Sequence, residues 1–335
     1  MQRSNSIWHP LAVLEPEWLD YDANKLHSPQ HGRHPPVLLD NCIYVGGSPS
    51  YGSSKGELLK YSLAERSWDI IRTPKEAAEG YVLAMYSNKV VLVGGQSIRD
   101  QVRSNKVWVR QGTVWRDDLI PQVPVPARSG VILSAIGHGD LLIVAYKTVT
   151  VLLNSITTES RIFCDGWKSP CPGPPLRTQY DRVNIIVHES YLYAITYTYP
   201  HNNEILFFRA QFSSTTYKVG EWKQLSNECG CFQSSTPPRF AIFGNKLVIA
   251  KIDGPKVVLY TPFIDVNDTL SLVDIGDLNV DFYSVDCIIG HTGTSESLIV
   301  MGQAKKTETS IYKSSVVKFN YKGTDYMYIH VPIVS

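Results

Sequence analysis

A short apolar pattern recurs six times along the chain, and this repetition constrains the fold more than any other feature of the sequence. Successive copies begin about 50 residues apart, which matches the period of a propeller blade that carries loop insertions. The copies are "DNCIYVGG" (40–47), "NKVVLVGG" (88–95), "GDLLIVAY" (139–146), "SYLYAITY" (190–197), "NKLVIAKI" (245–252) and "SESLIVMGQ" (295–303).

Each copy lies in the same local context of four expected strands. An apolar strand precedes it, a polar turn of two or three residues joins the two as in a hairpin, and a third strand follows after a variable loop. The fourth strand often begins with an aromatic residue: Trp68 follows Tyr61 by seven residues, and Trp115 follows Trp108 at the same interval. In the fourth copy an insertion moves the corresponding tryptophan to Trp222. The repeating unit is therefore four antiparallel strands.

A single four-stranded sheet cannot bury both of its faces, whereas sheets set radially around an axis bury one another. The chain is thus predicted to be all-β, a six-bladed β-propeller with four antiparallel strands in each blade. Glycine pairs at 46–47 and 94–95 allow the backbone to turn tightly near the crowded axis. The predicted blades cover approximately residues 35–72, 80–120, 128–165, 181–226, 237–276 and 282–331.

An apolar run, Gly-Gly, an aromatic residue, a short spacer and then tryptophan together resemble the kelch repeat. The resemblance covers residues 35–331 and is most specific in the first two copies, because the last four lack Gly-Gly. Members of that family often serve as scaffolds or substrate-recognition modules, so the resemblance implies a non-catalytic role in protein binding. The residues of the repeat signature are Gly46, Gly47, Tyr61, Trp68, Gly94, Gly95, Trp108, Trp115 and Trp222.

The N-terminal segment 1–34 contains a further expected strand, "SIWHPL" (6–11), without three strands before it. Kelch-like propellers often close when such a strand completes the last blade, which would place Trp8 in the outer strand of the sixth blade. The segment "DYMYIHV" (325–331) is the alternative occupant of that position. We expect closure by the N-terminal strand, with 12–34 as a surface connection.

The charge balance and apolar runs exclude several classes of partner. Thirty-two basic residues stand against 31 acidic ones, so neither a nucleic-acid surface nor an anionic-membrane surface is expected. No apolar run approaches the roughly 20 residues that a membrane-spanning helix needs. The N-terminus has no apolar core of a secretory signal. We expect a cytoplasmic, monomeric protein.

Two clusters of metal-type ligands have a simpler interpretation as loop residues. Cys229-Gly230-Cys231, with Cys164 and Cys171, is compatible with a zinc or redox site, but the paired spacing and flanking histidines of such sites are missing. The histidines His9, His27, His31 and His34 are irregularly spaced. We therefore expect free thiols, solvated histidines, and neither a metal nor another cofactor.

The sequence contains no nucleophile elbow, phosphate-binding loop or dinucleotide fingerprint. Some kelch-like propellers are enzymes: galactose-oxidase relatives use copper with histidine and a modified tyrosine, and nitrile-specifier relatives use an acid-acid-histidine iron motif. Neither set matches residues of this chain, so we expect no enzymatic activity.

By strand order, the loops between second and third strands share one rim with the connections between blades. These loops are rich in Ser, Tyr, Pro and Arg, as recognition loops are. We predict that this rim binds a segment of a partner protein. The alternative is an enzyme or carbohydrate-binding propeller with a small-molecule site at its axial mouth. The candidate binding residues are Tyr51, Arg99, Arg103, Arg128, Arg177 and Tyr199.

Overall fold

The structure is a computed structural model in which every element of regular structure but one is a β-strand. Within the described residues there is one short 3-10 helix, η1 (Lys75–Ala77), and no α-helix. The all-β class predicted from the sequence is confirmed. The described residues are 5–8, 15–19, 36–46, 56–97, 99–100, 102–123, 132–138, 141–146, 149–158, 161–167, 171–172, 181–198, 202–216, 218–227, 238–243, 246–253, 256–264, 268–278, 282–292, 296–305, 312–320 and 328–331.

The chain divides into two compact units, and each is described by itself. The first unit comprises Met1–Asp20, Pro238–Phe263 and Ser271–Ser335, and the second comprises Tyr21–Pro237 with Ile264–Leu270.

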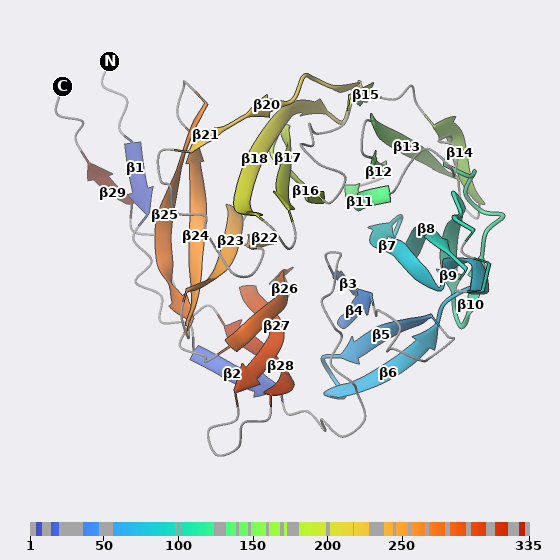
Figure 1. The fold of residues 1–335 in the computed structure, drawn as a ribbon, viewed down its shortest axis with the longest axis horizontal. Helices are drawn as coiled ribbons and strands as arrows, with labels where there is room; N and C mark the ends of the chain where they lie inside the picture. Colours follow the sequence, from blue (N-terminus) through green and yellow to red (C-terminus); the bar gives the residue numbers. More distant parts are fainter. Residues whose placement is uncertain are drawn as a thin grey trace. The chain divides into compact units, whose positions relative to one another are not determined.

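The second unit contains four antiparallel sheets, I to IV, that follow one another along the chain (Figure 1). In each sheet the first four strands pair in sequence order, so neighbours in the chain are neighbours in the sheet. Sheet I consists of β3 (Val37–Leu39), β4 (Cys42–Gly46), β5 (Glu57–Ser62) and β6 (Ser67–Arg72). Sheet II consists of β7 (Glu79–Tyr86), β8 (Lys89–Gln96), β9 (Val107–Gln111) and β10 (Val114–Arg116).

Sheets III and IV each add a fifth short strand that pairs with the third strand of the sheet. Sheet III consists of β11 (Ile132–His138), β12 (Leu141–Tyr146), β13 (Val149–Thr158), β14 (Arg161–Trp167) and β15 (Cys171–Pro172). Sheet IV consists of β16 (Asp181–His188), β17 (Tyr191–Thr198), β18 (Asn202–Ser213), β19 (Lys218–Val219) and β20 (Lys223–Gln224).

The core of the second unit lies between the faces of consecutive sheets. One cluster of buried side chains joins sheets I and II, a second joins II and III, and a third joins III and IV. The first strands also lie against one another in order, β3 on β7, β7 on β11 and β11 on β16. Strand β8 is buried over five consecutive residues, Val90–Gly94, as expected of a strand covered on both faces. The second unit is therefore a β-propeller-like arrangement of four antiparallel blades.

The signature residues of the first two copies occupy buried or sterically special positions. Gly94 and Gly95 have φ of +71° and +107°, a conformation that glycine adopts without steric cost. Tyr61 is fully buried, and its ring centroid lies 4.9 Å from that of Trp68. Trp108 is also buried in the core between sheets I and II. Trp115 and Trp222 are half-buried and Gly46 lies near Tyr81, whereas Gly47 lies outside the described residues.

The first unit contains two further sheets and a two-stranded ribbon. In sheet V the order is β25-β24-β23-β22, and β21 pairs in parallel with the start of β25. In sheet VI the order is β2-β28-β27-β26. The strands that lie wholly or mainly in the first unit are β1 (Asn5–Trp8), β2 (Glu15–Leu19), β22 (Arg239–Phe243), β23 (Lys246–Asp253), β24 (Lys256–Ile264), β25 (Thr269–Leu278), β26 (Phe282–Thr292), β27 (Glu296–Lys305), β28 (Tyr312–Asn320) and β29 (Tyr328–Val331). Strand β21 (Ser226–Asn227) and the two residues of β25 with which it pairs belong to the second unit.

The strand that pairs with β28 is not the N-terminal strand that the sequence analysis predicted. The structure places β2 there, with Trp18 opposite Val317, whereas the predicted occupant was the segment 6–11 with Trp8. Strand β1, which contains Trp8, instead pairs with β29, the proposed alternative occupant. Part of the expected surface connection 12–34 is thus a strand. Pro16 lies within β2, and proline is tolerated in a strand only at an edge, which weakens the strand signal of this segment.

Candidate functional site: the loop edge of the second unit

Hydrogen bonds define one edge of sheets I and II where loops gather. Thr73 N, just after β6, donates to Gly56 O at the end of the β4–β5 loop, at 3.1 Å. Val123 N, beyond β10, donates to Asn105 O at the end of the β8–β9 loop, at 2.8 Å. In both sheets the loop between the second and third strands therefore lies beside the segment that leaves the fourth strand, as predicted. We call this edge the loop edge.

The opposite edge of the sheets carries short hairpin turns, and we call it the turn edge. Leu63 N donates to Asn41 O at 2.9 Å, which brings the β5–β6 turn next to the β3–β4 turn. Asp40 and Asn41 both have positive φ, as do Ser87 and Asn88 in the β7–β8 turn. Two successive residues with positive φ are typical of the tight hairpin turns that match strand twist.

The β8–β9 loop is held in shape by its own backbone. Ser97 N donates to Val102 O at 3.2 Å, and Ser104 N donates to Gly95 O at 2.7 Å. Gln96 and Arg103 form an antiparallel bridge. Asp100 N lies 3.4 Å from Ser97 Oγ. The loop is therefore a continuation of the β8–β9 hairpin with a closed tip.

Four described side chains of this loop are exposed: Arg99, Asp100, Val102 and Arg103. Val102 is 65% exposed, an unusual exposure for an apolar residue inside an ordered loop. In sequence Val102 lies between the two arginines, so the loop offers an apolar contact together with charged hydrogen-bond donors. We call Arg99, Val102 and Arg103 the loop triad.

Polar contacts fix the base of the loop to the segment that follows β10. Lys106 Nζ lies 2.7 Å from Asp117 Oδ2 and 5.0 Å from the centroid of the Trp108 ring. The hydrogen bond to Asp117 raises the pKa of Lys106, so this lysine stays charged. Asn105 Nδ2 donates to Val123 O at 2.9 Å, which doubles the backbone link between the same two residues. The base of the loop that carries the loop triad is therefore fixed to the segment after β10.

Of the six predicted binding residues, two lie in the described part of the chain. Arg99 and Arg103 belong to the same loop and are both exposed. Whether the six converge stays a prediction, because the others lie outside the described residues. Val102 was missed by the sequence analysis, although a lone apolar residue between arginines in a polar loop was a usable signal. The predicted residues outside the described part are Tyr51, Arg128, Arg177 and Tyr199.

A second polar cluster, on sheet IV, was not predicted. The Arg209 guanidinium on β18 donates to the carboxylate of Asp268, and Lys223 Nζ lies 3.4 Å from the other carboxylate oxygen. The Arg209 guanidinium also lies 4.9 Å from the ring centroid of Tyr191. Burial raises the pKa of Asp268, but the hydrogen bonds and charges of Arg209 and Lys223 outweigh it and lower that pKa. This cluster links sheet IV to the segment that precedes β25, within the second unit.

The described residues contain no group of three or more His, Cys, Asp or Glu side chains that could hold a metal ion. Cys42 is a free, half-buried thiol packed against the core between sheets I and II. The cysteines and histidines considered above as ligands either lie outside the described residues or have undescribed side chains: Cys164, Cys171, Cys229, Cys231, His9, His27, His31 and His34.

Comparison of the sequence with protein-family models finds no match. A search of curated proteins also finds no match. Among the described residues, no helix has the length and apolar character needed to cross a bilayer.

Proposed function

We propose that the chain is a non-catalytic protein-interaction module that binds a segment of a partner protein at its loop edge. The observation that carries this proposal is the loop triad, because its three exposed side chains are presented by a backbone that is already closed by hydrogen bonds. A loop that is ordered before binding loses less conformational entropy when a partner docks. Arginine is also among the residues that most often dominate the energy of protein interfaces.

The finer architecture that we propose is a six-bladed, kelch-like propeller. Six copies of the strand pattern support it, as does the similar strand order of sheets V and VI. The pairing of N-terminal β2 with β28 also supports it, because a strand from the start of the chain completes the last sheet. A cytoplasmic location and a monomeric state remain part of the proposal; cell fractionation and light scattering test them.

The loop triad is tested by comparing partner capture between matched variants. The test variant is Arg99→Ala/Arg103→Ala, and a third protein carries Val102→Asp. The control removes two exposed positive charges on or near the turn edge, Arg66→Asn/Lys218→Ala. Asparagine suits position 66 because Arg66 has a φ of +51°, which asparagine tolerates. The control therefore changes net charge equally without touching the loop edge.

Each purified protein is used to capture partners from lysate, with quantification by mass spectrometry. The proposal predicts partners that bind the wild type and the control but are lost from both loop variants. Direct binding of the purified partner, measured by calorimetry, should then weaken by about tenfold or more when both arginines are removed. Equal capture by all four proteins would contradict recognition through the loop triad.

A further inference from the structure

Arg110, on β9 in sheet II, is held in place but has an unsatisfied hydrogen-bond donor. Its Nε donates to Gly112 O at 2.9 Å, and its guanidinium carbon lies 5.9 Å from the ring centroid of Trp115. Its Nη1 is buried and has no hydrogen-bond partner among the described residues. A buried donor without an acceptor is unfavourable, and more so when the group is charged. An external hydrogen-bond acceptor would satisfy the Nη1 donor of Arg110.

Trp115 fixes the plane against which this guanidinium lies. The indole Nε1 of Trp115 donates to the carbonyl of Arg72, at the end of β6 in sheet I, at 2.8 Å. The ring is therefore anchored to the neighbouring sheet, and Arg110 is confined between that ring and the β9–β10 turn. The guanidinium is thus positioned before any ligand arrives.

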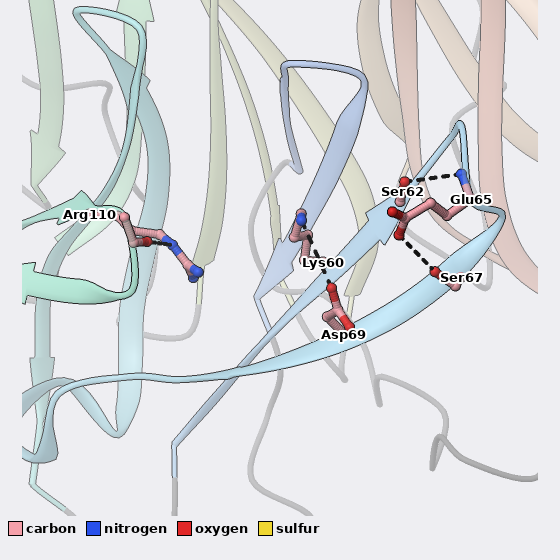
Figure 2. Close-up of polar contacts among 7 residues, drawn as sticks. Lys60, Ser62, Glu65, Ser67, Asp69 and Arg110 are labelled. Atoms are coloured by element: carbon pink, nitrogen blue, oxygen red, sulfur yellow. Dashed lines mark hydrogen bonds and ion pairs between the residues drawn. The ribbon is translucent and has the colours of Figure 1, made fainter.

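Sheet I carries a cation and a hydroxyl group on neighbouring strands, because Lys60 of β5 pairs with Tyr44 of β4. In Figure 2 the side chain of Arg110 extends from sheet II toward sheet I, where Lys60 lies on β5. Lys60 Nζ is 3.8 Å from Asp69 Oδ2, longer than a hydrogen bond, and the lysine side chain is 28% exposed. Burial raises the pKa of Tyr44 on β4, while the charges of Lys60 and Arg110 act in the opposite direction. Tyr44 therefore keeps its proton at neutral pH and remains a hydrogen-bond donor.

The acidic groups nearby leave Arg110 without a carboxylate. Asp69 is engaged with Lys60, and the described residues contain no ion pair to Arg110. Within the described part of the chain, the Arg110 guanidinium thus has no carboxylate partner.

We propose that Arg110, assisted by Lys60, forms a binding site between sheets I and II for an oxyanion of the phosphate or carboxylate type. A planar guanidinium matches the geometry of both groups, and a charge-assisted hydrogen bond would satisfy the buried Nη1. The site lies beside the β9–β10 turn, whereas the loop triad lies in the β8–β9 loop, at the other end of β9. It is therefore separate from the loop triad, and it does not depend on the proposed function.

The test measures thermal unfolding of the whole chain in sodium phosphate, sodium acetate and sodium chloride at matched ionic strength. A ligand that binds the folded state raises the melting temperature in a saturable way, while chloride reports the effect of screening alone. The variants are Arg110→Gln, Lys60→Gln and the control Arg116→Gln. Arg116 is an exposed arginine on the same hairpin, paired at 2.5 Å with Asp118.

We expect a saturable rise with phosphate, acetate or both in the wild type and in the control. In Arg110→Gln the apparent dissociation constant should rise by about tenfold or more. Lys60→Gln should weaken binding less, because that lysine is partly engaged by Asp69. If Arg110→Gln does not fold, Arg110→Lys replaces it; it keeps the charge without the planar fork and should bind with intermediate strength.

The pattern of responses identifies the ligand. A response to phosphate alone assigns the site to a phosphate group, and a response to acetate assigns it to a carboxylate. The proposal is overturned if neither anion exceeds chloride in the wild type, or if Arg110→Gln responds as the wild type does.

Discussion

Arg209 and Arg110 hold similar positions in sheets IV and II but end in different surroundings. Each lies on the third strand of its sheet, and each guanidinium lies near an aromatic ring, Tyr191 for Arg209 and Trp115 for Arg110. Arg209 binds the carboxylate of Asp268, whereas Arg110 has no such partner among the described residues. In both sheets the third strand carries an arginine that lies over an aromatic ring. The two differ in whether a nearby segment supplies a carboxylate, as the residue before β25 does for Arg209.

The largest expected effect comes from making Arg209 resemble Arg110. Asp268→Asn removes the carboxylate while keeping the shape of the side chain, so Arg209 and Lys223 lose their shared partner. We expect the free energy of unfolding in urea to fall by about 1–3 kcal/mol, because a partly buried guanidinium is left unpaired. The matched control is Asp69→Asn, whose ion pair with Lys60 is long and largely exposed. If the free energy of unfolding falls equally in both variants, the Asp268 cluster stabilises the fold no more than the Lys60–Asp69 pair does.

The same cluster should give the molecule a measurable dependence on acid. The pKa of Asp268 is lowered in the folded state, so its contribution to stability is present above the unfolded-state pKa, near about 3.9. That contribution is lost as pH falls through the lower, folded-state pKa. The difference in unfolding free energy between the wild type and Asp268→Asn should therefore be constant near neutrality and shrink toward zero in acid. Urea unfolding across pH 7 to 3 measures it, and a difference that grows as pH falls would reverse the assigned sign.

The two arginines also show what the sequence was able to predict. Strand pattern, hairpin turns and the Gly94–Gly95 pair are local signals, and the structure confirms them in sheets I and II. The Arg209–Asp268 pair joins residues 59 positions apart, and no local periodicity marks such a contact. Strand β2 was also missed. Pro16 lies within it, and a proline weakens the sequence signal for a strand.

Of the predicted binding rim, the candidate residues that the structure describes lie in one loop, β8–β9, and binding itself stays a prediction. The order of strands within a blade dictates which loops share an edge, so Arg99 and Arg103 were placed on that edge by topology alone. Their exposure and the closed shape of the loop depend on backbone hydrogen bonds such as Ser104 N to Gly95 O, which no residue pattern specifies. The exposure of the Val102 side chain likewise depends on the backbone shape of the loop, in which Val102 O accepts from Ser97 N.

A smaller effect is expected from the ring that supports Arg110. Trp115→Phe retains an aromatic face for the guanidinium but removes the indole N–H that donates to the Arg72 carbonyl. We expect a loss of about 0.5–1.5 kcal/mol in the free energy of unfolding, the usual contribution of one hydrogen bond. Val114→Ala, at an exposed neighbouring position, serves as the control and should change little. If Trp115→Phe proves as stable as the control, the link between sheets I and II does not depend on this hydrogen bond.

The smallest expected effect distinguishes the two arginines most sharply. In buffer whose only anion is chloride, Arg110→Met should leave the free energy of unfolding unchanged or raise it by up to about 1 kcal/mol. The reason is that a half-buried cation with one unsatisfied donor is replaced by an apolar chain that still packs on Trp115. The same substitution at Arg209 should be destabilising, because it strands the carboxylate of Asp268. If the oxyanion site exists, adding phosphate or acetate reverses the order at position 110, since only the wild type then gains binding energy. A clear loss of stability in Arg110→Met in chloride would instead show that the contacts of the guanidinium with Gly112 and Trp115 outweigh the cost of its unsatisfied donor.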